Sequence, residues 1–174
     1  LMRNEVAFGL ADVFQQTFPN DGLAWNPSGQ FVELVYNGVH VGNYYLCEHI
    51  KIDGNRLDIT DPFDEKDGYS GTPEDYGYLL EADDGYDETW KFTTANYIPF
   101  LFKDDGNDEM LSYVAGLVRG VEDKLYAGNY SAAYEQLDIT SLVEYWLIQE
   151  VMMNSEMKHP KSVYMYLNKG KLYA

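Results

Sequence analysis

Hydrophobic positions follow two different periods in the first third of the chain, and they predict a helix followed by a hairpin. Residues 1–15 have apolar side chains at the spacing of one helical face. Residues 31–36 are typical of a strand, and Asn37-Gly38 after them is the strongest short-range signal for a β-hairpin. Extended structure resumes over 39–50, with Gly42 as a candidate bulge.

The middle third has weaker patterns. Residues 53–76 are polar and contain Gly and Pro, which predicts irregular structure. Residues 78–82 form a short apolar run that predicts a buried strand, and residues 90–94 are a candidate for a second one.

The last third predicts two longer helices and a short one. An apolar stripe runs through residues 107–127, with Asp105 or Asn107 as the N-cap and Gly128 as the C-terminal glycine. Residues 131–137 are a candidate short helix. Ser141 and Glu144 have capping-box spacing before a helix that extends to about residue 153. That helix is apolar on nearly all sides, so we expect it to be buried.

A polar loop over residues 154–162 separates this helix from a terminal hairpin. The hairpin has a strand at 163–167, a turn at 168–170 and the start of a second strand at 171–173. Helices and antiparallel strands in this order predict an α+β fold.

Composition excludes several classes of protein. Hydrophobic residues make up 45% of the 174 positions, which is enough for a core and argues against disorder. Cys47 is the single cysteine, so a disulfide scaffold is excluded. The net charge of -17 opposes a phosphate backbone, so we expect no nucleic-acid partner. No apolar run reaches membrane-spanning length.

The charge is concentrated in the middle of the chain. Residues 53–109 hold 17 acids and four bases, whereas the only charged residues after Glu156 are four lysines. The acidic stretch is either a solvated loop surface or a surface that binds cations or steers a substrate. Its three Asp/Gly clusters lack the EF-hand spacing and are more typical of turns, with opportunistic calcium binding as the alternative.

Two places could carry chemistry. Cys47 is expected to be a small buried hydrophobe, and the alternative is a nucleophile with His49 as its base. The polar loop offers Glu156, Lys158 and His159, and later Lys161 and Ser162. An acid, a cation and a metal-holding group are what phosphoryl transfer needs, although a solvated connector has the same composition. Glycine-rich phosphate loops, zinc-ligand spacing and GxSxG are absent from the sequence.

Several motifs resemble one family. Residues 1–8 (LMRNEVAF), 36–51 (YNGVHVGNYYLCEHIK) and 145–166 resemble segments of the spore-coat protein H (CotH) kinase family, with 55–59 and 77–81 in register between them. The resemblance covers nearly the whole chain. It implies a partial atypical protein-kinase-like fold, with a β-hairpin-containing sheet and a mainly helical lobe. It further implies transfer of the ATP γ-phosphoryl group to protein Ser, with ATP and Mg²⁺ as cofactors.

The resemblance also implies roles for residues. Glu156 occupies the place of the catalytic-loop Asp, with Lys158 beside it as the second catalytic candidate. Glu48, Ile50 and Lys51 fall where the nucleotide-binding hinge would be. Ser162, or Lys161, falls near the metal-holding Asn.

Departures from the family pattern lower the expected activity. Glu in place of Asp moves the carboxylate by more than about an ångström, a displacement that can cost roughly a hundredfold in rate. The family's Lys-bearing strand and its WDFD segment are not in this sequence. We therefore expect one partial domain over 1–174, inactive by itself, with a helix and hairpin at 1–52, an acidic region at 53–106, and helices, polar loop and hairpin at 107–174.

Two other functions remain open. The first is a non-catalytic, pseudokinase-like surface domain that binds protein, and the second is a module that binds glycans or cations, which 16 tyrosines and the acidic loops would suit. Resemblance and composition together predict a bacterial protein that is extracellular or at the cell surface. Its expected partner is a protein substrate or a surface partner.

Overall fold

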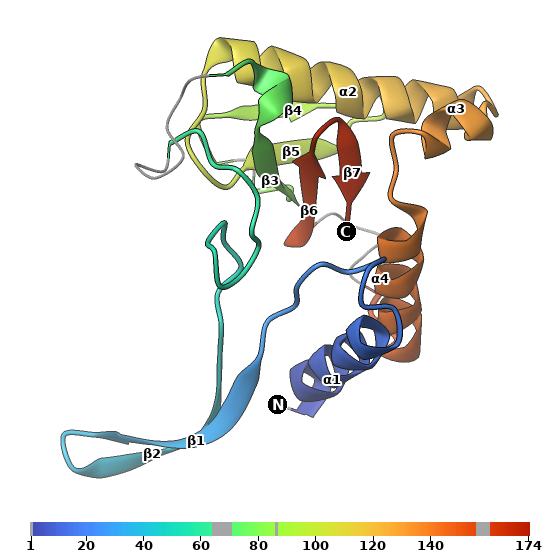
Figure 1. Cartoon of the computed structure of the whole chain (residues 1–174). Coiled ribbons are helices and arrows are strands. Elements are labelled where there is room, and N and C mark those ends of the chain that lie inside the picture. The colour runs from blue at the N-terminus through green and yellow to red at the C-terminus, as the bar shows by residue number, and fades with distance from the viewer. Residues whose placement is uncertain (1, 64–70, 86, 156–160) are drawn as a thin grey trace.

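The computed structural model describes residues 2–63, 71–85, 87–155 and 161–174. Its described residues form helices and two separate antiparallel sheets (Figure 1). The elements in chain order are α1 (Met2–Thr17), β1 (Gly29–Tyr36), β2 (Val39–Cys47), the 3₁₀ turn η1 (Pro73–Asp75), β3 (Gly77–Ala82), β4 (Lys91–Thr93), β5 (Pro99–Phe102), α2 (Asp108–Tyr126), α3 (Tyr130–Tyr134), α4 (Ile139–Val151), β6 (Val163–Asn168) and β7 (Lys171–Tyr173). The predicted α+β class is confirmed.

The larger sheet has the strand order β4-β5-β3-β6-β7, and each neighbouring pair is antiparallel. Strands β3 and β6 come from distant parts of the chain, so the acidic middle segment and the terminal hairpin share one sheet. Helix α2 covers one face (Figure 1). Alternate residues of the central strands point into this core, where Leu80 and Leu167 are fully buried. Strand β5 is an element that the sequence patterns missed.

The opposite face of the sheet carries a smaller apolar cluster. Leu79 and Tyr166 from β3 and β6 pack there against Leu57 and Ile59 of the irregular segment. Tyr166 also stacks on Tyr173 of β7, with ring centroids 4.7 Å apart. This face is the one that borders the functional cleft described below.

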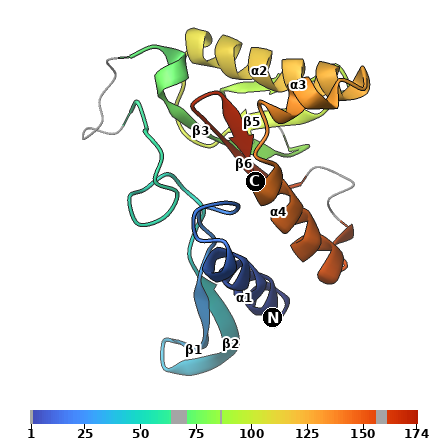
Figure 2. The ribbon, with the colours of Figure 1, turned by 45° about the vertical axis from the view of Figure 1, so that its right-hand side comes forward.

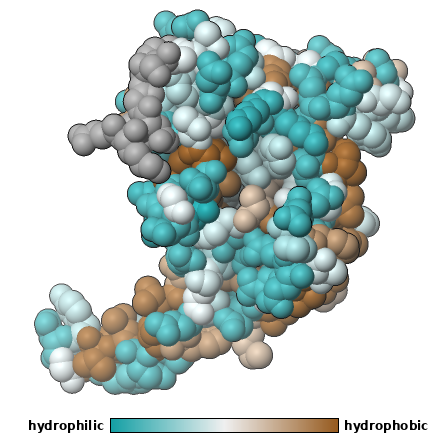
Figure 3. All heavy atoms as spheres, viewed as in Figure 1, coloured by the Kyte–Doolittle hydropathy of each residue, from teal (hydrophilic) through white to brown (hydrophobic). Residues whose placement is uncertain are grey.

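The smaller sheet is the predicted hairpin of β1 and β2. Asn37 and Gly38 both have positive φ, 49° and 77°, as a two-residue hairpin turn requires. The register shifts between Leu34 and Val35, opposite Gly42, so the predicted bulge is confirmed. The hairpin extends away from the rest of the molecule, and apolar side chains lie along its surface (Figures 1 and 3).

The sequence predicted the N-cap of α2 correctly but not that of α4. Asn107 accepts a hydrogen bond from the Met110 amide at 2.9 Å, which confirms it as the N-cap of α2. The capping box predicted for α4 is wrong. Asp138 is the N-cap and accepts from the Ser141 amide at 2.9 Å, because the helix begins three residues earlier than a cap at Ser141 requires. Glu144 instead accepts from the Leu23 amide at 2.8 Å.

Helix α4 is also less buried than its apolar sequence predicts. Ile148 is buried, but Val143, Trp146 and Val151 are 46%, 50% and 65% exposed. The reason is that α4 packs against α1 and β7 on one side, whereas no described element covers the other. No helix among the described residues is both long enough and apolar enough to cross a membrane.

Candidate functional site

A cleft of about 510 Å³ lies where α1, the end of β2, α4 and β6 meet. Its volume falls within the roughly 300–1,000 Å³ that is typical of small-molecule sites. Helices α1 and α4 lie side by side in both ribbon views and form one wall (Figures 1 and 2). Strand β6 forms the facing wall, and the segments 23–27 and 47–50 close the cleft between them.

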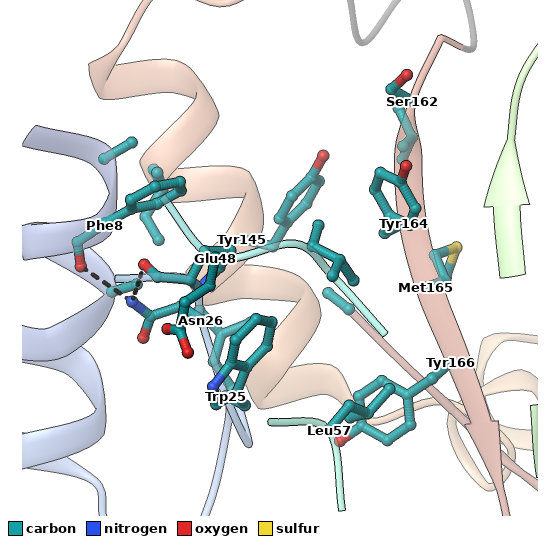
Figure 4. A pocket seen from close by; sticks show the side chains of 18 of the residues that line it. Phe8, Trp25, Asn26, Glu48, Leu57, Tyr145, Ser162, Tyr164, Met165 and Tyr166 are labelled. Carbon is teal, nitrogen blue, oxygen red and sulfur yellow. Dashed lines mark hydrogen bonds between the residues drawn. The ribbon is translucent and has the colours of Figure 1, made fainter. Parts of the chain in front are cut away.

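The walls of the cleft are largely aromatic. Phe8 comes from α1, Trp25 from the loop after it, Tyr145 from α4, and Tyr164 and Tyr166 from β6 (Figure 4). Burial raises the pKa of the Tyr145 and Tyr166 phenols, so both stay neutral at physiological pH. Flat apolar walls of this kind suit a planar aromatic ligand.

Asn26 places an unsatisfied acceptor in the cleft. Its side-chain amide nitrogen lies 3.4 Å from the Phe8 carbonyl, 3.2 Å from Asp12 Oδ1 and 3.3 Å from the Pro27 carbonyl. Its Oδ1 is buried, with almost no exposed surface, and has no hydrogen-bond partner among the described residues. A buried acceptor without a partner is costly, so a small turn of this side chain toward the cleft would let a donor group on a ligand satisfy it.

Glu48 lies at the rim of the cleft at the end of β2. Its Oε2 accepts hydrogen bonds from the Ser28 amide at 2.9 Å and the Ser28 hydroxyl at 2.8 Å. These two bonds, the amide first, lower the pKa of the Glu48 carboxyl. The group is therefore ionised and fixed in direction at neutral pH.

The opposite end of the cleft is polar. Asn154, Lys161 and Ser162 line it there, together with Gln149. Asn154 donates from its side chain to Gln149 Oε1 at 2.6 Å. The Lys161 ammonium is largely exposed and lies 3.7 Å from the carboxylate of Asp84. This end offers a cation and hydrogen-bonding groups to an anionic ligand.

A second polar network lies on the same face of the sheet. Lys103 forms an ion pair of 2.7 Å with the buried Glu81 and one of 3.3 Å with Glu88, and the hydrogen bond to Glu81 raises the Lys103 pKa. Burial raises the pKa of the Tyr164 phenol, and the charge of Glu81 adds to the rise. One wall residue of the cleft therefore lies within the electrostatic influence of this network.

The structure brings together some of the residues predicted from sequence. Glu48, Ile50 and Ser162 line the cleft, whereas Lys51 lies outside it with its ammonium 3.9 Å from Asp53. Glu156 and Lys158 fall outside the described residues. Their predicted catalytic roles stay predictions.

Cys47 corrects another expectation, because it is exposed instead of buried. The reason is that β2 has β1 as its neighbour in the sheet and little packed over its faces. Cys47 and His49 both line the cleft, but His49 Nδ1 is engaged at 2.7 Å with the Ile50 carbonyl.

Sequence reasoning missed Phe8, Trp25, Asn26 and Tyr145 as cleft residues. A tryptophan and an asparagine in a Pro-containing connector were the available signal, but nothing local indicates which cavity such a connector borders. The long-range contacts of α1 with α4 decide that.

The sequence was compared with models of known protein families. A family model described as CotH kinase protein matches residues 1–174. The chain belongs to the CotH kinase protein family. No curated protein and no solved structure matches it. The family implies a kinase-like fold, which agrees with the observed α+β architecture.

Proposed function

We propose that the cleft is the nucleotide site of a CotH-type atypical protein kinase domain. In this proposal the adenine base lies between the aromatic walls and the phosphates extend toward Lys161 and Ser162. Glu48 and Ile50 border the base at the rim, as the resemblance predicted. The parent protein would transfer the γ-phosphoryl group of ATP to a protein serine.

The observation that carries the proposal is the aromatic lining of the cleft, beside which the buried Asn26 Oδ1 has no partner among the described residues. The exocyclic amino group of adenine is a hydrogen-bond donor of the kind this oxygen lacks. Base–aromatic stacking contributes about 1–3 kcal/mol per base, and Trp25 and the tyrosines provide the faces for it.

The phosphate end fits an anion better than it fits a metal by itself. Lys161 supplies a positive charge there. Within the described ranges, no group of three or more His, Cys, Asp or Glu side chains is arranged to hold a metal ion. Mg²⁺ commonly binds through one or two protein groups and the substrate phosphates, so it enters this proposal together with the nucleotide. Ser162 remains the candidate protein ligand.

The test is a titration of the chain with ATP and Mg²⁺ followed by isothermal titration calorimetry, whose signal does not depend on Trp25. We expect saturable binding, and we expect Trp25→Ala to weaken it by roughly 10–100-fold through the lost stacking. Trp146→Ala is the matched control, because Trp146 is half exposed on α4 and outside the cleft. Equal effects of the two substitutions, or no binding by the unmodified chain, would contradict the proposal.

Binding and catalysis are expected to separate in this chain. With labelled ATP, we expect no measurable autophosphorylation or transfer to protein by residues 1–174. Glu156 in place of the family's Asp displaces the reacting carboxylate, which alone can cost about a hundredfold. Robust transfer of the label to any protein would overturn this expectation.

The second candidate is a non-catalytic surface domain that binds a protein partner on a kinase-like scaffold. The exposed apolar side of α4, with Trp146 and Val151, favours it. This function predicts that Mg²⁺-ATP leaves the melting temperature unchanged, whereas nucleotide binding predicts a rise that depends on ligand concentration. In both cases the proposed location is the bacterial surface.

A further inference from the structure

Arg3 and Asp83 lie outside the cleft, but each contacts one end of its polar wall. That wall consists of Asn154 at the end of α4 and of Lys161 and Ser162 just before β6. Arg3 lies on α1, and Asp83 lies just after β3. Both are therefore distant in sequence from the residues they contact.

Arg3 contacts the C-terminal end of α4. Its guanidinium donates to the Met152 carbonyl at 2.5 Å and to the Met153 carbonyl at 3.4 Å. The last carbonyls of a helix lack intrahelical partners, and a cation there is also favoured by the helix dipole. These contacts fix the backbone immediately before Asn154.

Asp83 contacts the other end. Its Oδ2 accepts from the Ser162 amide at 2.9 Å, while its Oδ1 accepts from the Gly85 amide at 2.6 Å. Both oxygens are thus in use, and the carboxylate ties the turn after β3 to the start of β6. The neighbouring Asp84 instead forms an ion pair of 3.7 Å with the exposed ammonium of Lys161.

The backbone at both contact points is unusual. Met153 has φ of 49° and Ser162 has φ of 50°, in the left-handed region that non-glycine residues rarely adopt. Such conformations persist only where the surroundings hold them, and they occur often at binding and catalytic sites. Arg3 and Asp83 make the side-chain hydrogen bonds that hold these two points.

We propose that Arg3 and Asp83 are positioning residues that hold Asn154, Lys161 and Ser162 in place at the phosphate end of the cleft. The inference rests on the proposed function for its ligand, but its geometry can be tested separately. Neither residue touches the ligand in this account. Each acts on the backbone that carries the lining groups.

The first measurement is amide hydrogen exchange by NMR in the chain without ligand. In Asp83→Ala the Ser162 amide loses its acceptor, so we expect its exchange to accelerate by about tenfold or more. Asp84→Ala is the matched control and should leave that amide unchanged. Unchanged exchange at Ser162 in Asp83→Ala would overturn the inference, whether or not the chain binds nucleotide.

The second measurement is the dissociation constant of a fluorescent ATP analogue with Mg²⁺. We expect Asp83→Ala and Arg3→Ala each to weaken binding by about tenfold, and Asp84→Ala to change it by less than about threefold. Asp83→Asn retains one acceptor oxygen and Arg3→Lys retains a cationic donor, so both should recover part of the loss. If the two residues only stabilised the fold, the conservative variants would not recover binding, and the loss of affinity in each variant would parallel its drop in melting temperature.

The outcomes separate the two proposals. No saturable binding by the unmodified chain would refute the proposed function and leave the exchange data to decide on Asp83. Normal binding that Asp83→Ala and Arg3→Ala leave unaffected would refute the positioning role and leave the proposed function intact.

Discussion

The two layers of the molecule bury their apolar residues to very different degrees. The sheet layer comprises the five-stranded sheet and α2. It encloses a continuous core in which Leu80 and Met110 are fully buried, at 0% exposed. The outer layer, which comprises α1, the β1–β2 hairpin and α4, leaves large apolar side chains exposed, such as Leu46 at 60% and Val151 at 65%. The cleft lies between the two layers.

The difference indicates which layer stabilises the fold and which one is available for binding. A two-stranded hairpin is marginal by itself, whereas a sheet of five strands packed on a helix has the means for independent stability. Exposed apolar surface of the outer layer is typical of interaction sites. We therefore expect substitutions to affect stability mainly in the sheet layer and ligand binding mainly at the junction.

The largest expected effect is on the free energy of unfolding, and it separates a leucine of the sheet layer from a leucine of the hairpin. Leu80→Ala removes a fully buried side chain from β3, and we expect it to lower the free energy of unfolding by about 3–5 kcal/mol. Leu46→Ala on the exposed hairpin should cost less than about 0.5 kcal/mol. Urea unfolding followed by circular dichroism measures both. Similar costs would show that the hairpin is as much part of the core as β3.

The next comparison uses two buried carboxylates of the sheet layer. Glu81 is paired with Lys103, which also contacts Glu88, so Glu81→Met removes the shorter of two ion pairs and should destabilise the chain by about 2 kcal/mol. Glu122 on α2 is 8% exposed, and neither of its oxygens has a hydrogen-bond partner within the part of the chain that the structure describes. Glu122→Met should therefore stabilise the folded chain by about 1 kcal/mol. Destabilisation by Glu122→Met would mean that this carboxylate has a favourable role.

A smaller effect is expected at the junction from Glu48. Its folded pKa lies below the ordinary value of 4.5, because the Ser28 amide and hydroxyl donate to the ionised form. The resulting stabilisation is fully present above pH 4.5 and is lost as the pH falls through the lower, folded value. Melting temperatures of the unmodified chain and of Glu48→Gln should thus converge as the pH is lowered through this range. A constant difference between them would contradict the assignment.

Local signals predicted the fold well where the decisive contacts are local. The hairpin turn at Asn37-Gly38 and the cap at Asn107 depend on neighbouring residues, and both are confirmed. The capping box at Ser141 failed because Asp138, three residues earlier, offers a competing cap that the tertiary structure uses.

The candidate site was predictable only in part. Glu48 and Ile50 could be placed through the family resemblance, since they directly follow a recognisable hairpin. Trp25 and Asn26 lie in a connector whose position is set by the packing of α1 on α4, and no sequence period encodes that contact. The positioning contacts of Arg3 and Asp83 are equally long-range.

The most direct test of the nucleotide site is photolabelling with 8-azido-ATP in the presence of Mg²⁺, followed by peptide mapping. We predict that the label, which reports the position of the base, appears on peptides that contain Trp25, Tyr145 or Tyr164, and that unlabelled ATP suppresses it. Labelling that is spread over the hairpin and the exposed side of α4, or that ATP does not suppress, would contradict the account.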